Sequence, residues 1–409
     1  MTQSAPLPFI PTESKPEGPE SSERLKRLRR AARERFESLP WPVRTDEEWR
    51  RTDPGKIPLS KVELEPAEPA LSVGWETPSP EMIRSGVILT DLETGFRQFR
   101  DLIEEHLFTA GEPQGLLKFG ALHQAFWKQG LFCWVPDGVR VELPLKARLS
   151  LARPGAAVFP HLLVVVGRGS ELTLIDERFS GENAAAPSVS DEMTEIVLKG
   201  GAALQYVRLQ RWGRSVTDLL AQRTVLERDA RLLQVNIGLG GGLTKAHLET
   251  VLREPGSRAE LLGVLFGTED QHFDVHTLQD HRAPSTFSDL LYKSALKDRA
   301  RAIYTGLIRI APTAQKSDAY QANRNLLLSP AAKSDSVPML EIEADDVHCT
   351  HGVAVGPVDE EQKFYLMSRG LPAPEAERLI VEGFFDQVFR RLPSEALREE
   401  LAAEVVNRL

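Results

Sequence analysis

The stretch from Ala344 to Gly356, ADDVHCTHGVAVG, places one of the two cysteines of the chain between two histidines. His348 directly precedes Cys349, and His351 follows two residues later. In an extended strand, Cys349 and His351 point to the same face. A thiolate and an imidazole with this spacing can ligate one soft metal ion or cluster, but they supply only half of a four-ligand shell. From spacing alone, a structural thiol in a turn explains the stretch equally well.

A second histidine-rich stretch, QHFDVHTLQDH, lies about 70 residues earlier. On a strand, His272, Asp274 and His276 would project from one face, with His281 a little beyond. Two imidazoles and a carboxylate are an established set of ligands for iron or zinc. The alternative is a polar strip in which these groups bond to one another and to the backbone. Because H-x-H and H-E-x-x-H spacings are absent, the polar strip is the favoured interpretation.

Other motifs that carry chemistry are missing. The glycine-rich stretch Gly238–Lys245, GLGGGLTK, lacks the phosphate-loop spacing, so we predict a bend between strands and no ATP hydrolysis by this chain. No G-x-S-x-G elbow occurs. Cys133 lies between aromatic residues in GLFCWVP, which predicts a small buried hydrophobe.

Composition narrows the class of protein. The 409 residues are 41% hydrophobic with a net charge of −9, which argues against a broad nucleic-acid surface. No apolar run approaches the ~18 residues of a membrane span, and no signal-peptide core begins the sequence. Two cysteines, 133 and 349, make no disulfide framework, so we expect a cytoplasmic protein without membrane contact.

The elements that must position these residues fall into four segments. Residues 1–20 are rich in Pro, Ser and Glu and are predicted to form a disordered arm. Residues 21–135 show helical patterns, beginning with a helix capped by Ser22, and predict an N-terminal helical domain. Residues 136–356 contain strand-length apolar runs without amphipathic helices between them. Residues 357–409 turn helical again, with Asp359 as a cap.

A weak repeat runs through the strand-rich segment. A charged or glycine-containing turn, a small residue and an apolar strand recur in GRGSELTLI, KGGAALQYV, ERDARLLQV, EPGSRAELL and KDRARAIYT. Such repeats indicate stacked units that bury their apolar faces against neighbours, as in a β-solenoid. A sandwich of hairpins is the competing architecture, but Asp137-Gly138 is the only Asn-Gly or Asp-Gly dipeptide that would mark a two-residue hairpin turn.

At this point three ordered stretches resemble a known family. HFDVHTLQDHRAPSTFSDLLYKSALKDRARAIYTGLIRI, AQKSDAYQANRNLLLS and PMLEIEADDVHCTHGVAVGPVDEEQKFYLMSRGL are similar to the SufB/SufD family of iron–sulfur cluster assembly scaffolds. The likeness runs from about residue 260 to 372, and VRTDEEWRRTDP resembles the N-terminal region of the family. The Cys-x-His-Gly around Cys349 favours the SufD branch, since SufB typically carries His-Glu-Ala there.

The resemblance implies a fold and a role. The fold would be mainly β: a right-handed parallel β-helix core between N-terminal and C-terminal helical domains. The role would be a non-catalytic scaffold that pairs with SufB, binds the ATPase SufC and holds no permanent cofactor. A transient iron–sulfur cluster would form at the SufB interface, where His351 would face a SufB cysteine and Cys349 would help. The chain alone could form a homodimer.

The C-terminal helices would dock SufC. Their apolar stripe, Leu379, Phe384, Val388 and Phe389, is the candidate surface, with core packing inside the helical domain as the alternative. Two other functions stay open. One is a homodimeric SufB-like scaffold, and the other is a stand-alone β-solenoid metalloenzyme that uses His272, Asp274 and His276.

Overall fold

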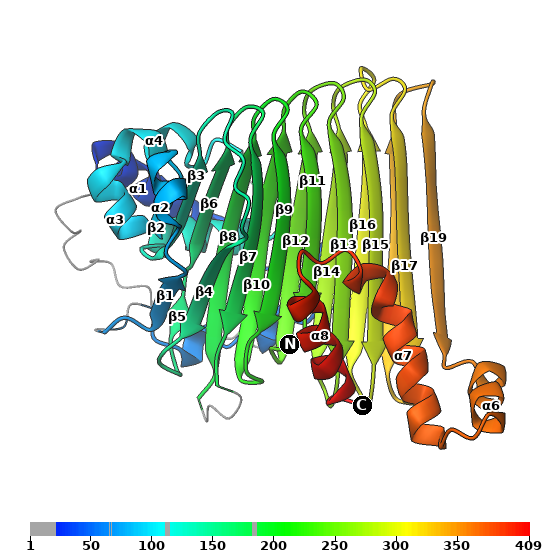
Figure 1. The fold of residues 1–409 in the computed structure, drawn as a ribbon. Coiled ribbons are helices and arrows are strands. Elements are labelled where there is room, and N and C mark those ends of the chain that lie inside the picture. The colour runs from blue at the N-terminus through cyan, green and yellow to red at the C-terminus, as the bar shows by residue number, and fades with distance from the viewer. Residues whose placement is uncertain (1–21, 65, 67, 111–114, 182–185) are drawn as a thin grey trace.

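The computed structural model describes residues 22–64, 66, 68–110, 115–181 and 186–409, so the predicted arm, residues 1–20, lies outside the described residues. Its main feature is a β-solenoid built from two long sheets, with helices near both ends of the chain (Figure 1). The chain alternates between the sheets, and from β6 and β7 onward each long strand pairs in parallel with the strand one turn earlier. The prediction of a mainly β solenoid between helical segments is confirmed.

Within the described residues, the first sheet has nine strands and the second has ten. The nine-stranded sheet comprises, in order, β1 (Leu71–Trp75), β4 (Leu145–Leu151), β7 (Glu171–Phe179), β9 (Ala203–Arg211), β11 (Arg231–Gly238), β13 (Arg258–Gly267), β15 (Phe287–Leu296), β17 (Asp318–Leu327) and β19 (His348–Pro357). The ten-stranded sheet comprises β2 (Ile88–Asp91), β3 (Gly130–Val135), β6 (His161–Val166), β8 (Ser188–Leu198), β10 (Val216–Leu226), β12 (Leu243–Leu252), β14 (His272–His281), β16 (Arg301–Ile310) and β18 (Lys333–Ile342), while β5 (Ala157–Val158) pairs with β8 beside it.

The sequence repeat marks the turns of the solenoid. Its first four copies lead into β7, β9, β11 and β13, which stack in register with a period of 27 to 32 residues. The fifth copy, KDRARAIYT, leads instead into β16 of the opposite sheet, so its assignment to the same series was wrong. The reason is shared turn chemistry: a residue with positive φ precedes strands of both sheets, as at Asp229 before β11 and Asp298 before β16.

Two other local predictions are confirmed. The glycine-rich stretch connects β11, which ends at Gly238, to β12, and Gly241 adopts a φ of 73° that favours glycine. Cys133 is fully buried in the solenoid core, where burial raises the pKa of its thiol to about 12.

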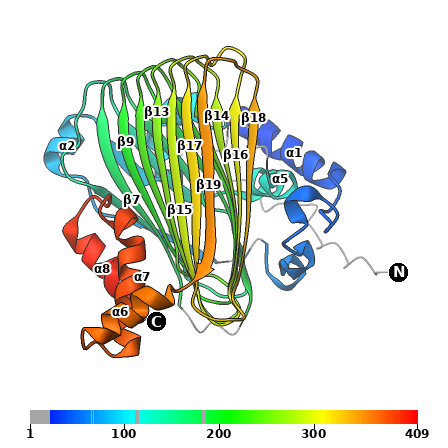
Figure 2. The same ribbon diagram turned by 90° about the vertical axis from the view of Figure 1, so that its right-hand side faces the viewer.

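The N-terminal helices are α1 (Glu23–Ser38), α2 (Pro80–Arg84), α3 (Leu92–Gln98), α4 (Arg100–His106) and α5 (Leu117–Phe126). Ser22 caps α1 as predicted, because its Oγ accepts a hydrogen bond from Leu25 N at 3.2 Å. α1 and α5 lie against the outer face of the ten-stranded sheet (Figure 2), where Phe119 packs in one cluster with Leu163 and Val189. Strand β3 precedes the predicted boundary at 135 yet pairs in parallel with β6, so that sheet begins inside the segment predicted to be helical.

The C-terminal helices are α6 (Glu360–Ser368), α7 (Ala373–Phe389) and α8 (Glu395–Val406). Asp359 caps α6 as predicted and accepts hydrogen bonds from Glu361 N and Gln362 N. α7 and α8 lie on the outer face of the nine-stranded sheet, on the opposite side of the solenoid from α1 (Figure 2). Every helix in the described ranges is too short or too polar to cross a bilayer.

The two ends of the solenoid differ. At the N-terminal end, β1 runs antiparallel to β4 and β2 runs antiparallel to β3, so the terminal strand of each sheet breaks the parallel pattern. At the other end, β18 and β19 are the last strands of their sheets among the described residues (Figure 2). This uncovered end, formed by β18 and β19, is called the open end below.

Candidate functional site

Cys349 and His351 lie in β19 and face the interior of the solenoid at its open end. Cys349 is in register with Ala319 of β17, and His351 is in register with Gln321. Both β17 residues are buried inside the solenoid, and residues in register on parallel strands share a face. Cys349 accordingly packs against a small cluster that includes Ile308. The structure therefore brings the two predicted site residues to one face.

His348 is separated from this pair. As the neighbour of Cys349 in the strand it points to the outer face, where its Nδ1 lies 3.1 Å from Asp318 Oδ1. Burial, followed by the negative charge of Asp318, raises the pKa of the Cys349 thiol. The thiol is therefore held in its protonated form, and a metal ion would have to displace the proton before sulfur could bind.

The open end exposes apolar side chains that continue the inner columns of the solenoid. Leu340 and Ile342 of β18 are in register with Ile308 and Ile310, which are fully buried one turn earlier. At the end they are 37% and 42% exposed, and Val353 and Val355 of β19 are 45% and 44% exposed. Unpaired strand edges beside exposed apolar residues are the features of a surface that another protein covers.

The second histidine-rich stretch has different surroundings. Asp274 accepts hydrogen bonds from Lys245 Nζ at 2.8 Å and from Thr52, and its Oδ1 lies 3.0 Å from His276 Nε2. The Thr52 hydroxyl also lies 2.8 Å from His272 Nε2. Among the residues that the structure describes, no three His, Cys, Asp or Glu side chains are placed to hold a metal ion. These contacts match the polar-strip interpretation.

The electrostatics of this cluster explain its function in the fold. Burial lowers the pKa of His272 to about 4, so the imidazole stays neutral. Burial would raise the pKa of Asp274, but the hydrogen bond with His276 and the charge of Lys245 together lower it well below its usual value. Lys245 also donates to Glu48 O at 2.7 Å. The cluster thereby fastens the N-terminal segment around Thr52 to the ten-stranded sheet.

His281 does not join this cluster. It lies on the inner face of β14, fully buried, with its two ring nitrogens 2.7 Å from Thr286 Oγ1 and 2.7 Å from Ser288 Oγ. Sequence reasoning placed it near the other three residues but missed Lys245 and Thr52. Their partnership depends on strand register and on a contact more than 200 residues distant in sequence, which no local motif signals.

The predicted docking stripe on α7 is only partly exposed. Val388 and Phe389 are 0% and 4% exposed and pack against the nine-stranded sheet, so their assignment to a partner surface is corrected. Phe384 is partly buried beneath Lys293, whose Nζ lies 4.9 Å from the ring centre. Leu379 is 37% exposed. An amphipathic helix needs one apolar face, and here the solenoid covers most of it.

Helix α6 carries the exposed apolar residues that sequence reasoning missed. Phe364, Tyr365 and Met367 are 73%, 57% and 43% exposed. The only signal in the sequence is a pair of adjacent aromatic residues in a helix without an apolar stripe. Large aromatic side chains are enriched at protein–protein interfaces, so α6 is a better candidate for docking than α7.

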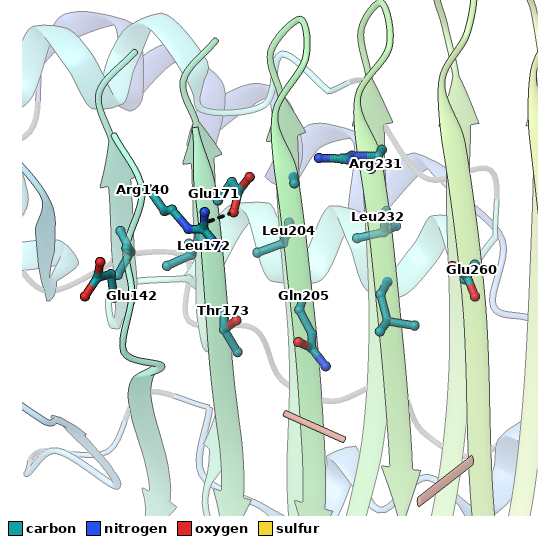
Figure 3. Close-up of a pocket in the computed structure, with 13 residues that line it drawn as sticks. Arg140, Glu142, Glu171, Leu172, Thr173, Leu204, Gln205, Arg231, Leu232 and Glu260 are labelled. Atoms are coloured by element: carbon teal, nitrogen blue, oxygen red, sulfur yellow. Dashed lines mark ion pairs between the residues drawn. The ribbon is translucent and has the colours of Figure 1, made fainter. Parts of the chain in front are cut away.

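A groove of about 520 Å³ lies on the outer face of β7, β9, β11 and β13 (Figure 3). Arg140 and Glu171 form an ion pair at 3.2 Å across its edge, and Glu260 pairs with Arg391 of the C-terminal segment at 2.6 Å. Its lining contains no thiol and no imidazole. A metal ion that prefers sulfur and nitrogen ligands would therefore find better donors at the open end, where Cys349 supplies a thiol and His351 an imidazole.

Comparisons with known proteins agree on one family. The model of the "SUF system FeS cluster assembly, SufBD core domain" matches residues 149–384. The chain is 30% identical over 315 residues to the iron–sulfur cluster assembly protein SufB of Bacillus subtilis, covering 76% of this chain and 66% of that protein. It is 31% identical over 328 residues to SufD of the same organism, covering 80% and 75%. A SufBD family protein of Mycobacterium leprae is 33% identical over 280 residues, covering 66% of this chain and 70% of that protein.

Proposed function

This chain belongs to the SufB/SufD family of the SUF iron–sulfur cluster assembly system, and from that premise we propose that it is a SufD-type scaffold subunit. The near-equal identity to SufB and SufD leaves the branch to local features. The Cys-x-His-Gly at residues 349–352 favours SufD. The observation that carries the proposal is that Cys349 and His351, only half of a four-ligand shell, lie together at the open end of the solenoid.

The partner at the open end is SufB. It covers the exposed apolar residues of β18 and β19 and supplies the ligands that Cys349 and His351 lack. The imidazole of His351 offers a ring nitrogen to iron, and the Cys349 thiol helps once iron displaces its proton. The cluster is the cargo of the complex, formed at the interface and then released. This chain holds its ligands in place and performs no bond-making of its own.

The ATPase SufC is the second partner, and it docks on the C-terminal helices. The exposed aromatic residues of α6, Phe364 and Tyr365, support this assignment. Because α7 packs against the nine-stranded sheet, a force applied by a partner on α6 would reach the solenoid through that contact. Hydrolysis of ATP belongs to SufC. The complex acts in the cytoplasm, where a reducing environment keeps both thiols free.

Co-purification with SufB and SufC tests these assignments. Val353→Asp places a charge on the open end, where the side chain is 45% exposed, so the chain should fold and lose SufB while retaining SufC. Val43→Asp is the matched control, because Val43 is 50% exposed and lies in the N-terminal segment. Capture of SufB by Val353→Asp at the wild-type level would contradict pairing at this end.

A second arm of the same experiment separates the two partners. Phe364→Ala combined with Tyr365→Ala should release SufC and leave SufB bound, because the residues that contribute most to an interface are often large aromatic side chains such as Tyr that the partner buries. Phe179→Ala, which removes a 47% exposed aromatic ring from β7, is the control. Retention of SufC by the double variant would place its docking surface elsewhere. If only a second copy of this chain binds, the homodimeric scaffold is the better account.

A further inference from the structure

A buried polar residue lies directly next to His351 along the inner column of the solenoid. Gln321 of β17 is in register with His351 of β19, and it is only 1% exposed. Its Nε2 donates a hydrogen bond to Gly306 O of β16 at 3.3 Å, so the amide lies inside the solenoid between the two sheets. Neighbouring strands are roughly 4.8 Å apart. His351 is therefore the next side chain on the same inner face.

The amide oxygen of Gln321 has no hydrogen-bond partner among the residues that the structure describes. Gly306 makes room for it, because a Cβ at that position would lie 2.3 Å from Gln321 Oε1 and 2.5 Å from Tyr304 Oη. Tyr304 already has a partner, since its hydroxyl lies 2.8 Å from Thr277 Oγ1. A buried acceptor without a donor is costly, and the side chain in register with Gln321 toward the open end is His351.

His351 can be that donor. A neutral imidazole carries one N–H and one lone pair, and the bond made by the N–H decides which nitrogen is left for a metal. Histidines that ligate metals almost always donate their other ring N–H to a neighbouring acceptor. We propose that Gln321 is the positioning residue of His351. Its Oε1 accepts the imidazole N–H, fixes one tautomer and leaves the second nitrogen facing the partner subunit.

Cys349 lacks an equivalent neighbour. The residue in register with it is Ala319, which has no polar side-chain atom. Of the two β17 side chains in register with Cys349 and His351, only that of Gln321, beside His351, can therefore accept a hydrogen bond. The role of this contact in cluster assembly rests on the proposed function. The contact itself is inferred from the register of β17 and β19 and from the unpartnered oxygen of Gln321.

The tautomer of His351 tests the inference. Gln321→Met removes the acceptor and keeps the length of the side chain. Gln222→Met is the matched control, because Gln222 of β10 is also 1% exposed, also has an amide oxygen without a partner among the described residues, and lies far from the open end. The readout is the 15N spectrum of the full chain labelled at histidine, with His351 assigned by comparison with His351→Ala.

Wild type and Gln222→Met should show one dominant tautomer of His351, and Gln321→Met should show a mixture of both. Gln321→Glu, which restores an acceptor, should return the spectrum to one tautomer. In complexes with SufB and SufC, Gln321→Met should slow cluster formation by about 10-fold or more, as loss of such partners does at metal sites. Unchanged tautomer populations in Gln321→Met would overturn the inference. Failure of the proposed function would show differently, as cluster formation at the wild-type rate by His351→Ala.

Discussion

The stretches around His272 and His351 look alike in sequence, since each places imidazoles beside polar residues on a strand, but their surroundings differ. His272 lies under the N-terminal segment, and its cluster is held by contacts within the same chain, from Thr52 to His272 and from Lys245 to Asp274. His351 lies at the open end, where the last strands expose apolar residues. The cluster around His272 stabilises the fold through contacts within the chain, whereas the pair Cys349 and His351 needs ligands from another protein to complete a metal site.

The largest expected effect is on the free energy of unfolding, where the cluster around His272 should contribute far more than an ion pair on the surface of β18. Asp274→Asn leaves the buried ammonium of Lys245 without its counter-charge, and we expect a loss of about 3–5 kcal/mol in the free energy of unfolding. Asp335→Asn removes a half-exposed carboxylate that pairs with Arg301 and should cost at most about 1 kcal/mol. Denaturant unfolding measures both. Equal losses of unfolding free energy in Asp274→Asn and Asp335→Asn would contradict the structural role of the cluster around His272.

The pH dependence of stability should follow the same division. The folded-state pKa of His272 is about 4, below the ordinary value of 6.5. As the pH falls, His272 therefore becomes protonated in the unfolded chain before it does so in the folded protein. The stability that the neutral imidazole provides is complete above pH 6.5 and is lost as the pH falls toward 4. Asp274, whose pKa is also lowered, extends the loss below pH 4.

His272→Gln should therefore flatten the fall in stability between pH 6.5 and 4. His348→Gln, at a side chain that is 77% exposed, should keep the wild-type profile. Unfolding midpoints measured across this range give the comparison. A wild-type slope in His272→Gln would mean that other buried histidines, such as His281, carry the whole effect.

The smallest effect is expected for the thiol. Cys349→Ser changes one partly buried atom at the open end, so the free energy of unfolding should change by no more than about 1 kcal/mol. Cluster formation should fall less than in His351→Ala, because under the proposed function SufB would supply sulfur ligands. Absorbance of the assembled cluster in the purified complex checks this order. A larger defect in Cys349→Ser than in His351→Ala would reverse the roles of the two residues.

The sequence predicts the local features well because they depend on neighbours in the chain. Alternating apolar runs and turn residues predict the strands, Ser22 and Asp359 predict helix starts, and strand alternation places Cys349 and His351 on one face. The likeness of the histidine stretches is also local. It cannot reveal that one is covered and the other is exposed, because covering depends on segments distant in the sequence.

What the sequence does not predict is which elements meet. Val388 and Phe389 form the same apolar pattern whether a helix packs on its own domain, on the nine-stranded sheet or on a partner, and only the tertiary contacts show that the sheet covers them. Register between distant strands likewise decides that Gln321 lies next to His351 and that Lys245 lies opposite Asp274.

Cluster formation by the His351→Ala complex tests the central claim most directly. The purified complex with SufB and SufC would receive iron, a sulfur donor and ATP, and the visible absorbance of the cluster would be followed in time. If His351 completes a site shared with SufB, the variant should assemble with both partners at wild-type yield. Its rate of cluster formation should be about one tenth of the wild-type rate or lower. Cluster formation at the wild-type rate would contradict the claim.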